Sequence, residues 1–201
     1  MNRAALATAA LLFSCALFAE SANGRFESLL GFKLNATNLT EITKRLGEAE
    51  RFDVPEGHHE YAICYRVKDS PNIIVFSSGA EFGSPEEKLL GLSVLKDNLR
   101  GFPCSTSTIL HKQILFDGLR MGLTEKQFRA LVGGSPKILE SGDLVRFFES
   151  ERSLSETELK KIAESYPDIY KRPVADVTHS VWGRFKDGLL IGFGCWRIET
   201  L

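Results

Sequence analysis

A phrase that starts a helix occurs twice in this chain, and this repeat is the strongest clue to how the chain is organised. Leu39-Thr40-Glu41 opens one amphipathic stretch, and Leu123-Thr124-Glu125 opens another 84 residues later. Threonine suits the N-cap, because its hydroxyl accepts a hydrogen bond from a free backbone N–H of the first turn. Asn38, directly before the first phrase, is a second capping candidate, and Gln127 makes a capping box possible in the second copy. Each half of the chain is therefore predicted to begin with a short helix.

Apolar runs separated by turn residues follow both predicted helices. Asp187-Gly188 between two such runs is a strong hairpin signal, because a type I′ turn needs positive φ at both positions. Ser155 is placed to cap a third helix, whose apolar residues recur with helical spacing. The predicted helices span about residues 41–46, 125–132 and 156–165, and the predicted strands span residues 61–67, 73–77, 90–95, 144–149, 177–186 and 189–198.

The order of these elements predicts an α+β fold of two tandem related units. Each unit is expected to pack short helices on a small antiparallel sheet, and Phe32 and Phe116 lie at the same offset before the two phrases. The predicted boundaries are residues 23–110 for the first unit and 111–201 for the second, which carries the inserted helix near 156–165.

The first 22 residues have the layout of a secretory signal peptide. Arg3 precedes an apolar run over residues 4–18, and small residues that suit cleavage follow at positions 19 to 22. The run is short for a membrane-spanning helix, which needs about 20 apolar residues. A periplasmic or secreted protein without a membrane span is expected after cleavage. A retained anchor is one alternative, and lipid attachment at Cys15 is another, although Phe13 is bulky for a lipobox.

Three cysteines remain after cleavage, and export places them where a disulfide can persist. The predicted bridge is Cys64–Cys104, because both residues bracket the strand region of the first half. Cys195 would then be the unpaired thiol. A Cys104–Cys195 bridge is the alternative.

The segment from Gly122 to Pro136 (GLTEKQFRALVGGSP) carries a family resemblance. It resembles the Gly-Met-Thr, helix, Leu-Leu-Gly-x-Pro phrase of small bacterial envelope domains. These are the outer-membrane-assembly lipoproteins of the SmpA/OmlA type and the tandem-repeat β-lactamase inhibitory proteins. The resemblance implies helices packed on an antiparallel sheet, in two units, within a bacterial envelope. Leu123 replaces the usual Met, and no residue of an inhibitory loop can be matched, so the resemblance implies a fold and not an activity.

Composition and motif spacing argue against several classes of function. The chain has 25 basic and 26 acidic residues, so it has no excess of positive charge for nucleic acid. Metal-ligand spacings are absent from the sequence, and the adjacent His58 and His59 would point to opposite faces of an extended chain. Neither a metal nor another cofactor is expected. A thiol nucleophile from Cys195 with His179, or from Cys104 with His111, is conceivable, but we do not expect an enzyme.

One surface of the last hairpin is a candidate binding face. A two-residue turn predicts that Arg184 pairs with Ile191 and that Trp182 pairs with Phe193. Trp182, Arg184, Phe193 and Arg197 would then share one face, with the Trp, Phe and Arg content typical of protein interfaces. The leading hypothesis is a non-enzymatic module that binds another envelope or extracellular protein. The alternatives are a carrier of a small molecule or lipid in a cleft between the units, and an uncharacterised hydrolase.

Overall fold

The fold is that of a computed structural model, which describes residues 25–54, 61–79, 88–98, 101–114, 116–165 and 172–201. The predicted signal peptide and Cys15 lie outside the described residues. Within the described ranges, no helix combines the length and apolar character that crossing a membrane requires.

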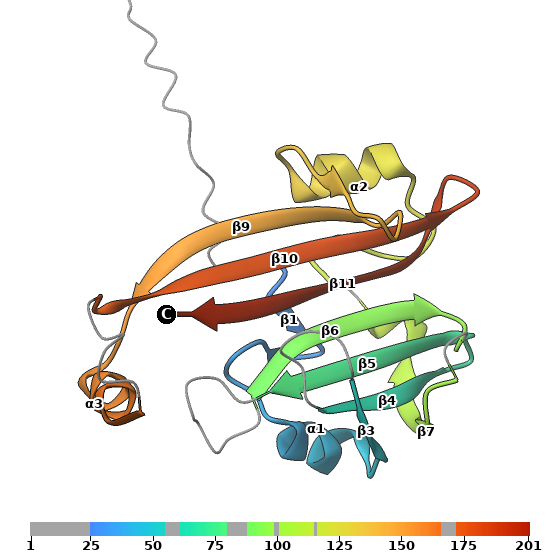
Figure 1. The fold of residues 1–201 in the computed structure, drawn as a ribbon. Helices are drawn as coiled ribbons and strands as arrows, with labels where there is room; N and C mark the ends of the chain where they lie inside the picture. The colour runs from blue at the N-terminus through green and yellow to red at the C-terminus, as the bar shows by residue number, and fades with distance from the viewer. Residues whose placement is uncertain (1–24, 55–60, 80–87, 99–100, 115, 166–171) are drawn as a thin grey trace, which may run out of the picture.

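A nine-stranded sheet forms the centre of the molecule, as Figure 1 shows. Its strands follow the order β3-β4-β5-β6-β11-β10-β9-β8, and β7 pairs with β4 in parallel, whereas the other pairs are antiparallel. A separate hairpin joins β1 (Ser28–Leu29) to β2 (Phe32–Lys33). The strands of the large sheet are β3 (Arg51–Asp53), β4 (Tyr61–Lys68), β5 (Asn72–Gly79), β6 (Lys88–Lys96), β7 (Cys104–Leu110), β8 (Lys137–Ile138), β9 (Leu144–Ser153), β10 (Val174–Lys186) and β11 (Leu189–Thr200).

The pairing of β6 with β11 joins the two halves of the chain. Leu92 of β6 lies opposite Cys195 of β11, and the ladder runs over five residue pairs. The prediction of a small sheet in each half is therefore wrong, because the strands of both halves form one large sheet. This pairing satisfies backbone N–H and C=O groups that two separate sheets would each have left at an open edge.

The α-helices of the described residues are α1 (Leu39–Leu46), α2 (Glu125–Val132) and α3 (Glu156–Ser165). The capping box of Thr124 and Gln127 at the start of α2 is confirmed. Ser155 also caps α3 as predicted, because its Oγ accepts from the N–H of Glu158. Thr40 is not a cap: Asn38 Oδ1 accepts from the N–H of Glu41 at 2.9 Å. Capping by Asn38 extends α1 to include the fully buried Leu39.

The main core lies between one face of the sheet and the helices α1 and α2. In Figure 1, α1 lies beside the β4–β5 end of the sheet and α2 beside the β9–β10 end. Ile42 of α1 and Phe128 of α2 are fully buried in the same apolar cluster. Phe128 packs directly on β10, where a Cβ added to Gly183 would come within 2.8 Å of its ring. Helix α3 packs separately, over Leu154 and Ala175.

The predicted disulfide between Cys64 and Cys104 is confirmed. The two residues face each other across the parallel pair of β4 and β7, with their Cα atoms 4.4 Å apart. The alternative bridge to Cys195 does not form, because that thiol is free and buried in the main core.

Candidate functional site

A cleft of about 320 Å³ lies on the face of the sheet opposite α1 and α2. Side chains alternate between the two faces of each strand, so Val75 lines the cleft while its neighbours Ile74 and Phe76 belong to the main core. The lining residues are Phe52, Asp53, Val54, Val75, Ser77, Ser93, Leu95, Phe102, Leu139, Asp143, Val145, Trp182, Arg184 and Trp196.

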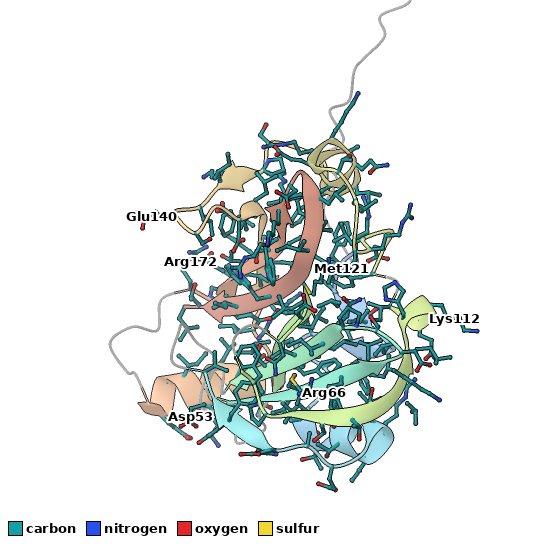
Figure 2. All side chains as sticks on the ribbon, turned by 90° about the vertical axis from the view of Figure 1, so that its right-hand side faces the viewer. Asp53, Arg66, Lys112, Met121, Glu140 and Arg172 are labelled. Atoms are coloured by element: carbon teal, nitrogen blue, oxygen red, sulfur yellow. A yellow bond between two sulfur atoms is a disulfide. The ribbon has the colours of Figure 1, made fainter. Side chains whose placement is uncertain are left out.

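The sheet curls around this cleft. Phe52 of β3 and Leu139, which follows β8, come from opposite ends of the strand order, yet both line the same cavity. In Figure 2, Asp53 and Glu140 lie on one side of the molecule, whereas Lys112 and Met121 lie on the other. The face that carries the cleft is therefore concave, and the two edges of the sheet form its walls.

The floor of the cleft depends on two glycines of β11. Gly194 lies opposite Trp182, and a Cβ added to it would come within 2.9 Å of the indole Nε1. A Cβ on Gly192 would come within 3.6 Å of the same ring. The absence of side chains at these two positions lets the indole of Trp182 lie across the backbone of β11.

The wall at the β3 edge is aromatic. Phe52 stacks on Phe102 with ring centroids 5.0 Å apart and an interplanar angle of 22°. Asn98 holds Phe102 on both sides: the N–H of Phe102 donates to Asn98 Oδ1 at 2.8 Å, and Asn98 Nδ2 donates to the Phe102 carbonyl at 2.7 Å. Cys104, two residues later, ties the same segment to β4 through the disulfide.

The opposite wall carries an ion pair. Arg184 Nε donates to Asp143 Oδ1 at 2.8 Å, and Nη2 donates to Oδ2 at 2.7 Å, so the pair is bidentate. The hydrogen bond to Asp143 raises the pKa of Arg184 and keeps its guanidinium charged. The Cζ atom of Arg184 also lies 6.0 Å from the ring centroid of Trp182. Arg184 is thus held in place by a carboxylate and a ring.

The predicted binding face is divided by a β-bulge in the last hairpin. The Asp187-Gly188 turn and the pairing of Lys186 with Leu189 are as predicted, with φ of 52° and 75° at the turn. The register then shifts between Arg184 and Phe185. Arg184 pairs with Gly192 rather than Ile191, and Trp182 pairs with Gly194 rather than Phe193, so both predicted pairings are wrong. The cause is one extra residue in β11, which reverses the face of each later side chain.

The four residues of the predicted face consequently lie on two faces. Trp182 and Arg184 line the cleft, whereas Phe193 is 1% exposed and packs in the main core. Arg197 lies on the core side as well, opposite His179. The shift places Trp196 beside Trp182 in the cleft. Sequence reasoning missed Trp196 because it assumed an unbroken ladder.

Arg197 belongs to a partly buried ionic cluster around the buried carboxylate of Glu199. Its Nη2 donates to Glu199 Oε1 at 3.0 Å, and Arg152 Nε donates to Glu199 Oε2 at 2.6 Å. Burial alone would raise the pKa of Glu199, but hydrogen bonds from the two arginines outweigh it and lower the pKa. Arg197 also reaches Glu27, and Arg152 reaches Glu158 of α3. This cluster ties the beginning and end of the described chain to β9 and α3.

The cysteines of the two candidate thiol sites are not exposed thiols: Cys195 is buried, and Cys104 forms a disulfide. Cys195 is 1% exposed, and burial raises the pKa of its thiol well above the ordinary value, which favours the unreactive protonated form. His179 is 4% exposed, and burial lowers its pKa. Cys104 is in the disulfide. Within the described ranges, no three His, Cys, Asp or Glu side chains are grouped so that they could hold a metal ion.

Searches of protein-family models, curated proteins and solved structures find no match to this chain. The resemblance to the envelope domains therefore stays a prediction.

Proposed function

We propose that this protein is a non-enzymatic binding protein that takes an amphipathic small molecule into the concave cleft. The observation that carries the proposal is the convergence of Trp182, Trp196 and the Phe52–Phe102 stack on one cavity. Ligand sites are typically concave and mainly apolar, with a few polar groups that orient the ligand. The cleft has this composition, and its 320 Å³ falls at the small end of the range of about 300–1,000 Å³ for such sites.

The cleft favours the carrier hypothesis over the protein-binding module. The hypothesis of a protein partner depended on four side chains that share a face, and Phe193 and Arg197 lie on the other side of the sheet from Trp182 and Arg184. The remaining pair lies within a curled sheet, where a compact ligand can contact both walls. A protein partner would have to insert a side chain to reach the same residues.

We further propose a periplasmic or secreted location. The support is the predicted signal peptide together with the Cys64–Cys104 disulfide, which is consistent with an oxidising compartment. Lipid attachment at Cys15 is the alternative form of the same proposal.

The tandem duplication also stays a proposal. Its support is the repeated phrase and the strand order, in which α1 precedes β3 to β6, α2 precedes β8 to β11, and the two sets meet at their last strands.

The test uses the neutral fluorophore N-phenyl-1-naphthylamine. Both tryptophans of the chain line the cleft, so energy transfer from tryptophan reports binding there. With the wild-type protein, we expect energy transfer from tryptophan to the fluorophore that saturates as the fluorophore concentration rises. Ser77→Leu, which fills the cleft from β5, should weaken binding at least 10-fold, whereas Ser150→Leu on an exposed part of β9 should leave it unchanged. Equal affinities for the two variants would refute the proposal.

A further inference from the structure

We infer that the ligand of the cleft is an uncharged molecule in which an apolar body carries a hydrogen-bond acceptor such as a carbonyl oxygen. The inference rests on the proposed function and adds the polar chemistry of the ligand. It follows from the charges of the lining, which neutralise each other, and from hydrogen-bond donors that have no partner among the described residues.

The charged side chains of the described lining leave no net charge in the cleft. Asp143 and Arg184 form a bidentate ion pair, with hydrogen bonds of 2.7 and 2.8 Å. Asp53 also lies at the cleft wall, but side chains alternate along β3, and its pairing with Tyr61 turns the Asp53 carboxylate to the face opposite Phe52. An ion of either sign would lose its hydration in the cleft without meeting an opposite charge that is free to pair with it. The cleft therefore favours an uncharged ligand.

A row of three residues crosses the floor of the cleft. Ser93 of β6 pairs with Gly194 of β11, which in turn pairs with Trp182 of β10. A Cβ on Gly194 would lie 3.0 Å from the Cα of Ser93 and 2.9 Å from the indole Nε1 of Trp182. Because Gly194 has no side chain, the indole N–H lies close to Ser93. One ligand atom beside the indole is thus near enough to reach both the N–H of Trp182 and the hydroxyl of Ser93.

The same arrangement recurs one strand further across the sheet. Ser77 of β5 pairs with Gly91 of β6, and Gly91 pairs with Trp196 of β11. Ser77 and Trp196 both line the cleft, as Ser93 and Trp182 do. The floor of the cleft therefore carries two serine hydroxyls and two indole N–H groups.

These polar groups are free to bind a ligand. The two serines and the two tryptophans are half-buried, and their side chains make no hydrogen bond with another described residue. An indole N–H donates and cannot accept, whereas a hydroxyl can do either, so the group that satisfies both is an acceptor. A carbonyl oxygen has two lone pairs and can accept from two donors. A ligand with such an oxygen on an apolar body would satisfy the donors while its body packs on the aromatic walls.

The experiment compares two ligands that differ at one group. Benzophenone has a carbonyl where diphenylmethane has a methylene, and the affinity of each is measured by displacement of N-phenyl-1-naphthylamine. Ser93→Ala should weaken the binding of benzophenone about 2- to 10-fold, the effect of one lost hydrogen bond, and should change that of diphenylmethane by less than about 2-fold. Trp182→Phe keeps a ring but removes the N–H, so it should weaken benzophenone more than diphenylmethane. Ser150→Ala, on the exposed part of β9, is the matched control and should change neither.

Two charged analogues test whether the ligand is uncharged. Diphenylacetate carries a carboxylate on the central carbon, and diphenylmethylammonium carries an ammonium group there. At neutral pH, each should bind at least about 10-fold more weakly than benzophenone, because its charge loses hydration in the cleft and gains no free counter-charge.

Three results would overturn the inference while leaving the proposed function intact. One is that Ser93→Ala or Trp182→Phe weakens benzophenone no more than diphenylmethane. Another is a charged analogue that binds as tightly as benzophenone. The third is that benzophenone fails to displace a fluorophore that does bind to the wild-type protein. If the fluorophore itself does not bind, the proposed function fails.

Discussion

The backbones of β6 and β11 approach each other closely at Gly194, and this approach predicts a large effect of a single methyl group. We expect Gly194→Ala to destabilise the protein strongly. The new Cβ would lie 2.4 Å from the backbone oxygen of Leu92 and 3.0 Å from the Cα of Ser93, and backbone atoms cannot move aside as the end of a side chain can. Gly192→Ala is the matched control on the same strand and face, where the nearest atom is a Leu95 methyl at 3.1 Å.

The size of the expected loss in unfolding free energy follows from the strain that the new methyl group puts on the pairing of β6 with β11. Overpacking of this kind costs about 1–3 kcal/mol, and a weakened sheet hydrogen bond adds about 1 kcal/mol. The lower entropy of the unfolded alanine chain offsets about 0.4–1 kcal/mol. Gly194→Ala should therefore lower the free energy of unfolding by about 1–3.5 kcal/mol. Gly192→Ala should change it by less than about 1 kcal/mol, since the Leu95 side chain can rotate away.

Urea unfolding of both variants and the wild type, followed by far-UV circular dichroism, measures these differences. A lower urea midpoint with an unchanged m-value would show that the substitution lowers the free energy of unfolding and leaves the surface exposed on unfolding unchanged. Gly194→Ala should also weaken the binding of N-phenyl-1-naphthylamine, because the new methyl displaces the indole of Trp182. If Gly194→Ala were as stable as Gly192→Ala, the close approach of the two strands beneath the cleft would be refuted.

Two further predictions concern the covalent and ionic links. Replacing both Cys64 and Cys104 with alanine should lower the free energy of unfolding by about 4 kcal/mol, because the bridge closes a segment of 40 residues; an unchanged urea midpoint relative to the oxidised wild type would contradict this. Acid should destabilise the protein as the pH falls from about 4.5 towards about 2, since the hydrogen bond from Arg152 lowers the pKa of Glu158 to about 2 in the folded state. A depressed folded-state pKa contributes stability that is present above the unfolded pKa and lost as the pH falls through the folded value. Glu158→Gln should therefore be less stable at neutral pH and show a shallower decline over this window, and parallel stability curves for the two proteins would rule out the contribution.

Features with local causes were predictable from the amino-acid sequence. The capping box of Thr124 and Gln127 and the cap at Ser155 depend on residues within one helical turn, and both form as predicted. The Asp187-Gly188 turn likewise follows from two adjacent residues that tolerate positive φ. The Cys64–Cys104 bridge was identified from its place in the chain, although the parallel pairing of β4 with β7 that creates it was not predicted.

The cleft itself was decided by tertiary structure. A single extra residue, Ile191, reverses the faces of the later β11 side chains, and nothing in a local apolar pattern marks where the register shifts. The pairing of β6 with β11 joins segments about 100 residues apart, and the curl of the resulting sheet brings Phe52 and Leu139 to one cavity. The helix caps, the hairpin turn and the number of aromatic residues thus follow from the amino-acid sequence alone. Which of those aromatic residues share a surface depends on the fold, because the long-range register of the strands sets the face of the sheet on which each side chain lies.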